Sequence, residues 1–199
     1  MKTTLLRRFT PAPLSTRLLS LGMLVLGVVL LLVQGPTKVA VALFIWFGYC
    51  FFVFPWLFQC FNISLRYLPP ITLCAWLHIL GVAYAFDQLF YYDKVVHLSV
   101  GALLAFVVSD WFDRSANPAN PSWLVFTFLS VLGVAAFWEI SEYSGDLLFA
   151  SGSQGVYDSA GQPVVSALDD SMIDMMTSGA GALIGIGIRS VLSRREAGR

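Results

Sequence analysis

Six long apolar segments constrain the fold of this chain more than any other feature of its sequence. A helix needs about 20 residues to cross the hydrocarbon core of a bilayer, and each segment is close to that length. The sequence therefore predicts an all-α, polytopic membrane helical bundle, with short connections and a single transmembrane domain covering residues 1–199. The predicted spans are residues 18–33, 39–58, 70–86, 95–112, 123–142 and 171–192.

Composition and charge support a membrane protein and limit its partners. The chain is 57% hydrophobic and only 12% charged, which excludes an ordinary soluble domain. Its formal net charge is zero, so no basic field favours binding to nucleic acid. We expect membrane lipids as partners, with a lipid or cell-envelope molecule as the substrate, and no nucleic acid.

Four reactive side chains in or beside the second and third spans are best interpreted as structural. Cys50, Cys60 and Cys74 show neither CxxC spacing nor a pairing pattern, so we expect small buried hydrophobic residues. His78 lies in the middle of an apolar segment, where a packed histidine with satisfied hydrogen bonds is expected.

The first apolar segment follows a polar and basic stretch, residues 1–17, and a signal peptide is the alternative interpretation. The segment is long for the apolar region of a signal peptide, and residues 34–36 offer no small-x-small cleavage site. We therefore expect a retained first helix.

Basic residues predict the orientation, because they concentrate on the cytoplasmic side of membrane proteins. In a six-span arrangement, only Lys38 and Lys94 of the twelve Lys and Arg residues lie on the other side. Both termini, residues 1–17 and 193–199, are therefore expected to be cytoplasmic. Residues 147–168 lack Lys and Arg and are expected to form an external loop.

Three polar stretches are predicted to meet in one layer near the outer face. Asp93 and His97 stand one turn apart at the start of the fourth span, and Asp170 and Asp174 stand likewise at the start of the sixth. Glu139 lies about 24 Å along the fifth span, which runs outward, at 1.5 Å per residue. All three stretches therefore reach the same depth.

The sixth span continues its polar face into small residues. Ser178, Gly181 and Gly185 follow Asp170 and Asp174 on one face, and the two glycines form a GxxxG pattern. Such a pattern lets helix backbones approach closely in a membrane. We expect tight packing of this helix with its polar stripe turned inward.

Several carboxylates in one apolar layer need compensation, because charged side chains are costly within a membrane. Either they share protons or a bound cation neutralises them, so a divalent cation is the cofactor to consider. Oxygen ligands with one histidine suit Mg, Mn, Ca or Zn. The candidate catalytic residues are His97, Glu139 and Asp174. The candidate metal ligands are His97, Glu139, Glu142, Asp170, Asp174 and Asp93.

A structural interpretation of the same residues stays open. Asp93 and Lys94 suit an interfacial position, and Asp170 suits the N-cap of the sixth helix. Glu139 and Asp174 favour function more strongly, since each lies inside an apolar run.

The polar stretches resemble those of a known family. The marks are YDKVVH at residues 92–97, WEISE at residues 138–142, and a D-x-x-x-D pattern followed by spaced glycines. With these marks, residues 62–192 resemble the YjdF-like family of bacterial inner-membrane proteins, which is itself similar to VanZ-like proteins. Ser178 departs from the pattern, which has Asn or Asp at that position. The resemblance implies a multi-pass protein of the bacterial inner (cytoplasmic) membrane, with a link to the cell envelope.

Three functions are compatible with these features, and the sequence leaves open whether the chain is an enzyme. The first is a metal-dependent enzyme acting on a lipid or cell-envelope substrate at the outer face. The second is a small cation- or proton-coupled transporter, although inverted repeats are not evident and the charges lie at one face. The third is a noncatalytic envelope or assembly factor in which the cluster only holds helices together.

Overall fold

The computed structural model describes residues 10–35, 37–85, 90–115, 122–149, 154–157 and 163–197. Contacts divide the chain into two compact units, Met1–Ala85 (the first unit) and Phe86–Arg199 (the second unit), so the single domain stays a prediction. The described residues contain six helical spans long and apolar enough to cross a membrane, which confirms the all-α polytopic bundle. These spans are Leu14–Gln34, Lys38–Cys60, Leu65–Tyr84, Tyr91–Phe112, Ser122–Leu148 and Ala167–Arg195.

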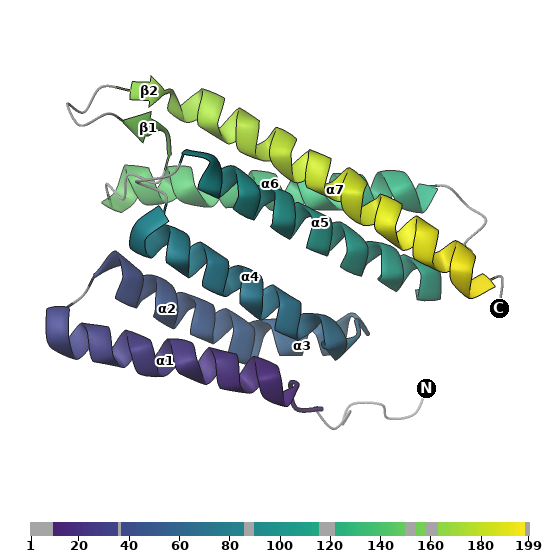
Figure 1. Cartoon of the computed structure of the whole chain (residues 1–199), viewed down its shortest axis with the longest axis horizontal. Helices are drawn as coiled ribbons and strands as arrows, with labels where there is room; N and C mark the ends of the chain where they lie inside the picture. The colour runs from purple at the N-terminus through teal and green to yellow at the C-terminus, as the bar shows by residue number, and fades with distance from the viewer. Residues whose placement is uncertain are drawn as a thin grey trace, which may run out of the picture. The chain divides into compact units, whose positions relative to one another are not determined.

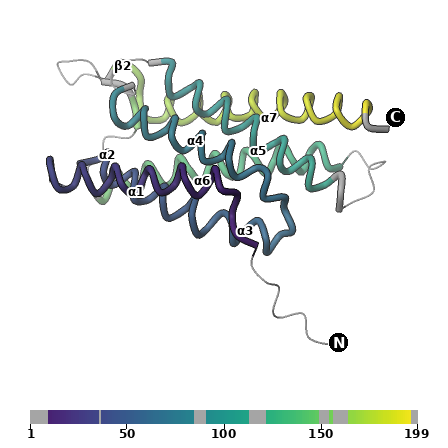
Figure 2. Tube along the Cα trace, turned by 60° about the horizontal axis from the view of Figure 1, so that its bottom comes forward, coloured from purple at the N-terminus to yellow at the C-terminus, as the bar shows by residue number. Residues whose placement is uncertain are grey.

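The first unit packs its helices around an apolar core. Its helices are α1 (Leu14–Gln34), α2 (Lys38–Gly48), α3 (Phe54–Cys60) and α4 (Leu68–Leu80). Helix α1 lies alongside α2, as both cartoon and trace show (Figures 1 and 2). The buried core residues are Met23, Leu43, Cys50, Ala75 and Ile79.

Two π-helical segments interrupt the regular helices of the first unit, and a 3₁₀ turn (Leu65–Tyr67) precedes α4. The segment Tyr49–Val53 joins α2 to α3 within one span, and the Phe54 N–H bonds to the Tyr49 carbonyl, five residues earlier. Pro55 follows and has no N–H to donate, so the regular ladder cannot continue there. The second such segment, Gly81–Ala85, follows α4.

The reactive side chains of the first unit have structural positions with one exception. The Trp46 indole N–H donates to Nδ1 of His78 at 3.1 Å, so the expected satisfied histidine is present. Cys50 is buried and Cys74 half-buried, but Cys60 is exposed. The prediction for Cys60 was therefore wrong, because this residue is the last of α3, where the chain leaves the helix.

The second unit contains three long helices and a short hairpin. These are α5 (Phe90–Ser115), α6 (Ser122–Phe149), the antiparallel strands β1 (Val156–Tyr157) and β2 (Pro163–Val165), and α7 (Ala167–Ala197). The predicted external loop at residues 147–168 thus has different bounds, since α6 continues through Phe149 and α7 begins at Ala167. Its outward orientation stays a prediction.

Helices α5 and α7 run parallel and make the most extensive contact between any two helices (Figure 1). A Cβ added at Gly181 would overlap the backbone of Leu98, and one added at Gly185 would overlap that of Ala102. The predicted close approach at the GxxxG pattern is therefore present, and it is made with α5. Helix α6 runs antiparallel to both, so its last turns and the first turns of α5 and α7 meet at one end.

Candidate functional site

The Lys94 ammonium lies at the centre of a cluster of carboxylates at that end of the second unit. Its Nζ is 2.6 Å from an oxygen of Asp170, 2.6 Å from one of Asp174 and 3.1 Å from one of Asp93. The Lys94 side chain is only 12% exposed. Lys94 therefore joins α5 to α7 through buried ion pairs, a role that the interfacial alternative for Asp93 and Lys94 did not include.

The structural alternative for Asp170 is corrected. Ser166 precedes α7, and its hydroxyl accepts a hydrogen bond from the Asp169 N–H at 3.1 Å while donating to the Asp169 carboxylate at 2.7 Å. The Asp169 N–H belongs to the third residue of α7, so the bond that it donates makes Ser166 the N-cap. Asp170, one residue further along, is buried and contacts Lys94 instead.

His97 is buried between α5, α6 and α7, with both ring nitrogens facing polar groups. Its Nδ1 is 3.2 Å from the hydroxyl oxygen of Ser178 on α7. Its Nε2 is 3.5 Å from an Asp93 oxygen, one turn earlier on α5, and 3.9 Å from Glu139 Oε1 on α6. The three polar stretches predicted to meet are therefore brought together around this ring.

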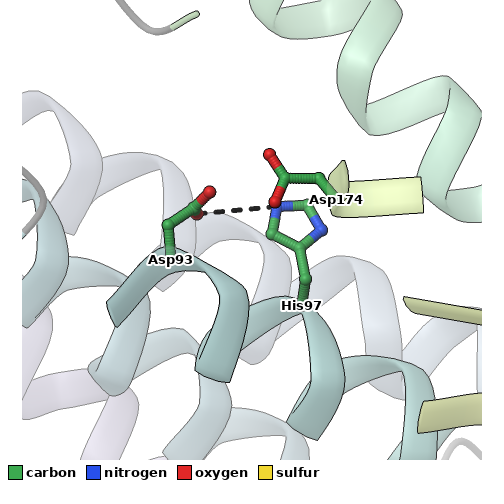
Figure 3. A group of neighbouring side chains, drawn as sticks. All are labelled: Asp93, His97 and Asp174. Carbon is green, nitrogen blue, oxygen red and sulfur yellow. Dashed lines mark ion pairs between the residues drawn. The ribbon is translucent and has the colours of Figure 1, made fainter. Parts of the chain in front are cut away.

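Three residues of this cluster could hold a metal ion. One ligand atom each from Asp93, His97 and Asp174 lies within 4.8 Å of the other two. Figure 3 shows the two carboxylates near the imidazole ring, with Asp93 and His97 coming from the same helix. The donor set of one imidazole nitrogen and two carboxylate oxygens suits a divalent transition metal.

Glu139 contributes a buried oxygen without a partner. The residue is 7% exposed, and among the described residues its Oε1 has no hydrogen-bond partner. An unpaired buried acceptor costs about 1–3 kcal/mol, so a native structure rarely keeps one without a reason. This oxygen points toward His97 Nε2 at a distance too long for a hydrogen bond.

The remaining candidate ligand, Glu142, has a different environment. Its carboxylate accepts a hydrogen bond from the indole N–H of Trp138 at 2.8 Å, one turn earlier on α6. The structure thus places Glu142 beside an aromatic side chain of its own helix, whereas Asp93, Asp170 and Asp174 share Lys94.

The segment before the hairpin ties the ends of α6 and α7 to the cluster. The Gln154 side chain donates to the Glu139 carbonyl at 3.3 Å and to the Ser171 hydroxyl at 3.0 Å. The Gly155 N–H donates to Asp170 at 3.0 Å, and its φ of +79° suits glycine. Sequence analysis missed these contacts because nothing local marks a loop residue that bonds to a helix backbone.

Lys94 and Ser178 are further residues of the cluster whose roles were not recognised from the sequence. Lys94 is the only basic residue among the acidic groups of the predicted outer layer, so charge balance could have identified it as their partner. Ser178 was known to share a face with Asp174, but its contact with His97 depends on how α5 and α7 are packed.

A second buried ion pair lies towards the other end of these helices. Nη2 of Arg189 on α7 is 3.5 Å from Oδ1 of Asp110 on α5, and both residues are buried. Arg189 therefore contributes to helix packing in addition to the charge pattern from which the orientation was predicted.

Comparison with known proteins identifies a family. A family model described as a predicted membrane protein (DUF2238) matches residues 15–195, a region that extends from the first candidate span to the last. No curated protein matches the chain, and no solved structure matches it. The family description and the six candidate spans agree on a multi-pass membrane protein.

Proposed function

The chain belongs to the DUF2238 family of predicted membrane proteins, and on that premise we propose that it is a membrane enzyme with His97 as its acid–base group. The substrate is a lipid or cell-envelope molecule that reaches the cluster from the outer face. The resemblance of residues 92–97 and 138–142 to YjdF-like and VanZ-like proteins supports a place in the bacterial inner membrane and a link to the envelope.

The observation that carries this proposal is the environment of His97 Nε2. Carboxylate oxygens of Asp93 and Glu139 lie on this nitrogen's side of the ring, at 3.5 and 3.9 Å. Carboxylates at this distance stabilise the imidazolium that forms when the ring takes up a proton. His97 therefore transfers the proton, and the two carboxylates stabilise the charge that results.

The proposal is tested by comparing envelope lipids from a strain that lacks the gene with those from strains carrying the wild type, His97→Gln or Asp169→Asn. Asp169 is an exposed residue of α7, and among the described residues its carboxylate accepts a hydrogen bond only from the hydroxyl of Ser166, the N-cap. It therefore serves as the control. We expect mass spectrometry to show a lipid or precursor restored by the wild type and by Asp169→Asn, but not by His97→Gln. Identical profiles in all strains would reject the proposal.

A second candidate function is a noncatalytic assembly factor, and the contacts of Lys94 favour it. The Lys94 ammonium pairs with Asp93 on α5 and with Asp170 and Asp174 on α7. Holding the two helices together would be a sufficient role for these ion pairs. In that case His97→Gln would restore the lipid profile fully while lowering thermal stability. The same set of strains therefore separates the two functions.

A further inference from the structure

We propose that Asp93, His97, Asp174 and Glu139 form a binding site for one divalent transition-metal ion, of the Zn²⁺ or Mn²⁺ type. The inference rests on the enzyme proposed above and changes the role of His97 in it, because a ring nitrogen that binds an ion cannot also take up a proton. It can nevertheless fail separately, because a histidine can transfer protons without a metal.

The distances from His97 Nε2 to the neighbouring carboxylates fit metal ligands better than they fit hydrogen bonds. Two ligands at about 2.1 Å from a tetrahedral metal lie about 3.4 Å apart, whereas hydrogen-bonded atoms lie about 2.7–3.2 Å apart. His97 Nε2 lies 3.5 Å from Asp93 and 3.9 Å from Glu139. The ligand atoms of Asp93, His97 and Asp174 lie within 4.8 Å of one another, so a metal would draw the most widely spaced pair together by at most about 1.4 Å.

Glu139 supplies an independent indication of a ligand. Its side chain is 8% exposed, and Oε1 has no hydrogen-bond partner among the described residues although it faces His97 Nε2. Glu139 is not one of the three residues whose ligand atoms lie within 4.8 Å of one another, but a cation at Nε2 would lie on the side of this oxygen. A shift of the Glu139 side chain toward Nε2 would supply the fourth ligand from α6, while the other three come from α5 and α7.

Charge balance supports a dication at this position. Three carboxylates, those of Asp93, Asp170 and Asp174, contact a single ammonium, that of Lys94, and the carboxylate of Glu139 lies beside His97. At Asp93 the two cations would use different oxygens, because Lys94 contacts Oδ2 while Oδ1 faces His97. The ammonium and the metal can therefore share the carboxylate of Asp93.

Ser178 orients the imidazole for this role. When His97 carries its proton on Nδ1, the ring donates to the Ser178 hydroxyl at 3.2 Å, and the lone pair of Nε2 faces the carboxylates. A metal-binding histidine usually donates its other N–H to such a partner, which fixes the tautomer and the ring orientation. The serine at this position is thus a positioning residue for His97.

The experiment uses the full chain, purified in detergent and stripped of metal with EDTA. Zn²⁺ and Mn²⁺ are titrated separately by calorimetry, and the bound metal is counted by elemental analysis. We expect one ion per chain, affinity reduced at least tenfold by His97→Gln and by Asp174→Asn, and about tenfold by Ser178→Ala. Asp169→Asn is the matched control for loss of a carboxylate, and it should bind like the wild type.

A spectroscopic measurement separates a ligand from a merely structural residue. Spin-echo modulation of bound Mn²⁺ should contain coupling to an imidazole nitrogen, which His97→Gln should remove even where some binding persists. Absence of stoichiometric binding, or binding that His97→Gln leaves unchanged, would overturn the metal site. Loss of the lipid product in His97→Gln without any metal binding would support the proposed enzyme and reject the metal site. Metal binding without a change in the lipid profile would support the metal site and reject the proposed enzyme.

Discussion

The two units of this chain differ in the acidic residues that they contain and in the surroundings of their histidines. The first 85 residues contain no Asp or Glu, so all twelve acidic residues of the sequence lie beyond them. The two histidines show the same contrast: His78 is bonded to Trp46 beside an apolar core, whereas His97 lies among carboxylates. The first unit is thus held mainly by apolar packing, and the second retains buried charges that stability alone does not require.

The units also differ in what their glycines contact. A Cβ at Gly27 in α1 would lie 3.3 Å from the Cβ of Leu43, so a shift of a few tenths of an ångström would relieve the contact. A Cβ at Gly185 in α7 would overlap the backbone of Ala102, which cannot adjust without moving α5. Close backbone contact fixes α5 against α7, and this rigidity places Asp174 and Ser178 beside His97.

Loss of the Lys94 charge should produce the largest effect. Lys94→Met leaves three carboxylates without their shared cation, and breaking a buried ion pair in this way costs about 3–5 kcal/mol. Lys38→Met removes an exposed lysine at the start of α2 and should change stability by less than about 0.5 kcal/mol. Unfolding in mixed detergent micelles measures both. Equal reductions in the free energy of unfolding for Lys94→Met and Lys38→Met would contradict the contrast between the units.

Glycine substitutions should produce an intermediate effect that differs between the units. Gly185→Ala forces α5 and α7 apart and should reduce the free energy of unfolding by about 1–3 kcal/mol. Gly27→Ala should cost less, because its nearest contact, 3.3 Å from Leu43, needs only a small shift. Gly187→Ala is the control within α7, since nothing lies within 4 Å of its added Cβ. A larger loss in Gly27→Ala than in Gly185→Ala would show that backbone contact is not decisive.

Replacement of His78 should produce the smallest effect. His78→Phe removes the hydrogen bond from Trp46 while keeping an aromatic ring, which should cost about 0.5–1.5 kcal/mol. Because this residue belongs to the packing of the first unit, the lipid profile and the binding of Mn²⁺ should stay at wild-type values. Weaker Mn²⁺ binding in this variant would show that the two histidines are not functionally distinct.

The sequence by itself determined the six spans and predicted one depth for the polar residues. Both are local properties, because span length follows from the thickness of the bilayer and depth follows from the rise per residue of a helix. The end of α6 was placed too early, since its apolar run stops near Glu142 while the helix continues through Phe149. Polar residues such as Asp146 extend the helix, and the Asp146 carboxylate accepts the Gln154 N–H.

Only the tertiary structure decided which polar groups meet. Lys94 bonds to residues 76 and 80 positions away, and His97 contacts Ser178, 81 positions away. These pairings depend on the rotation and spacing of α5 against α7, which close backbone contact at Gly181 and Gly185 fixes. Sequence spacing places residues on one face of one helix, but it does not specify which side chain of another helix lies opposite. For that reason the interfacial position considered for Lys94 said nothing of its partners on α7.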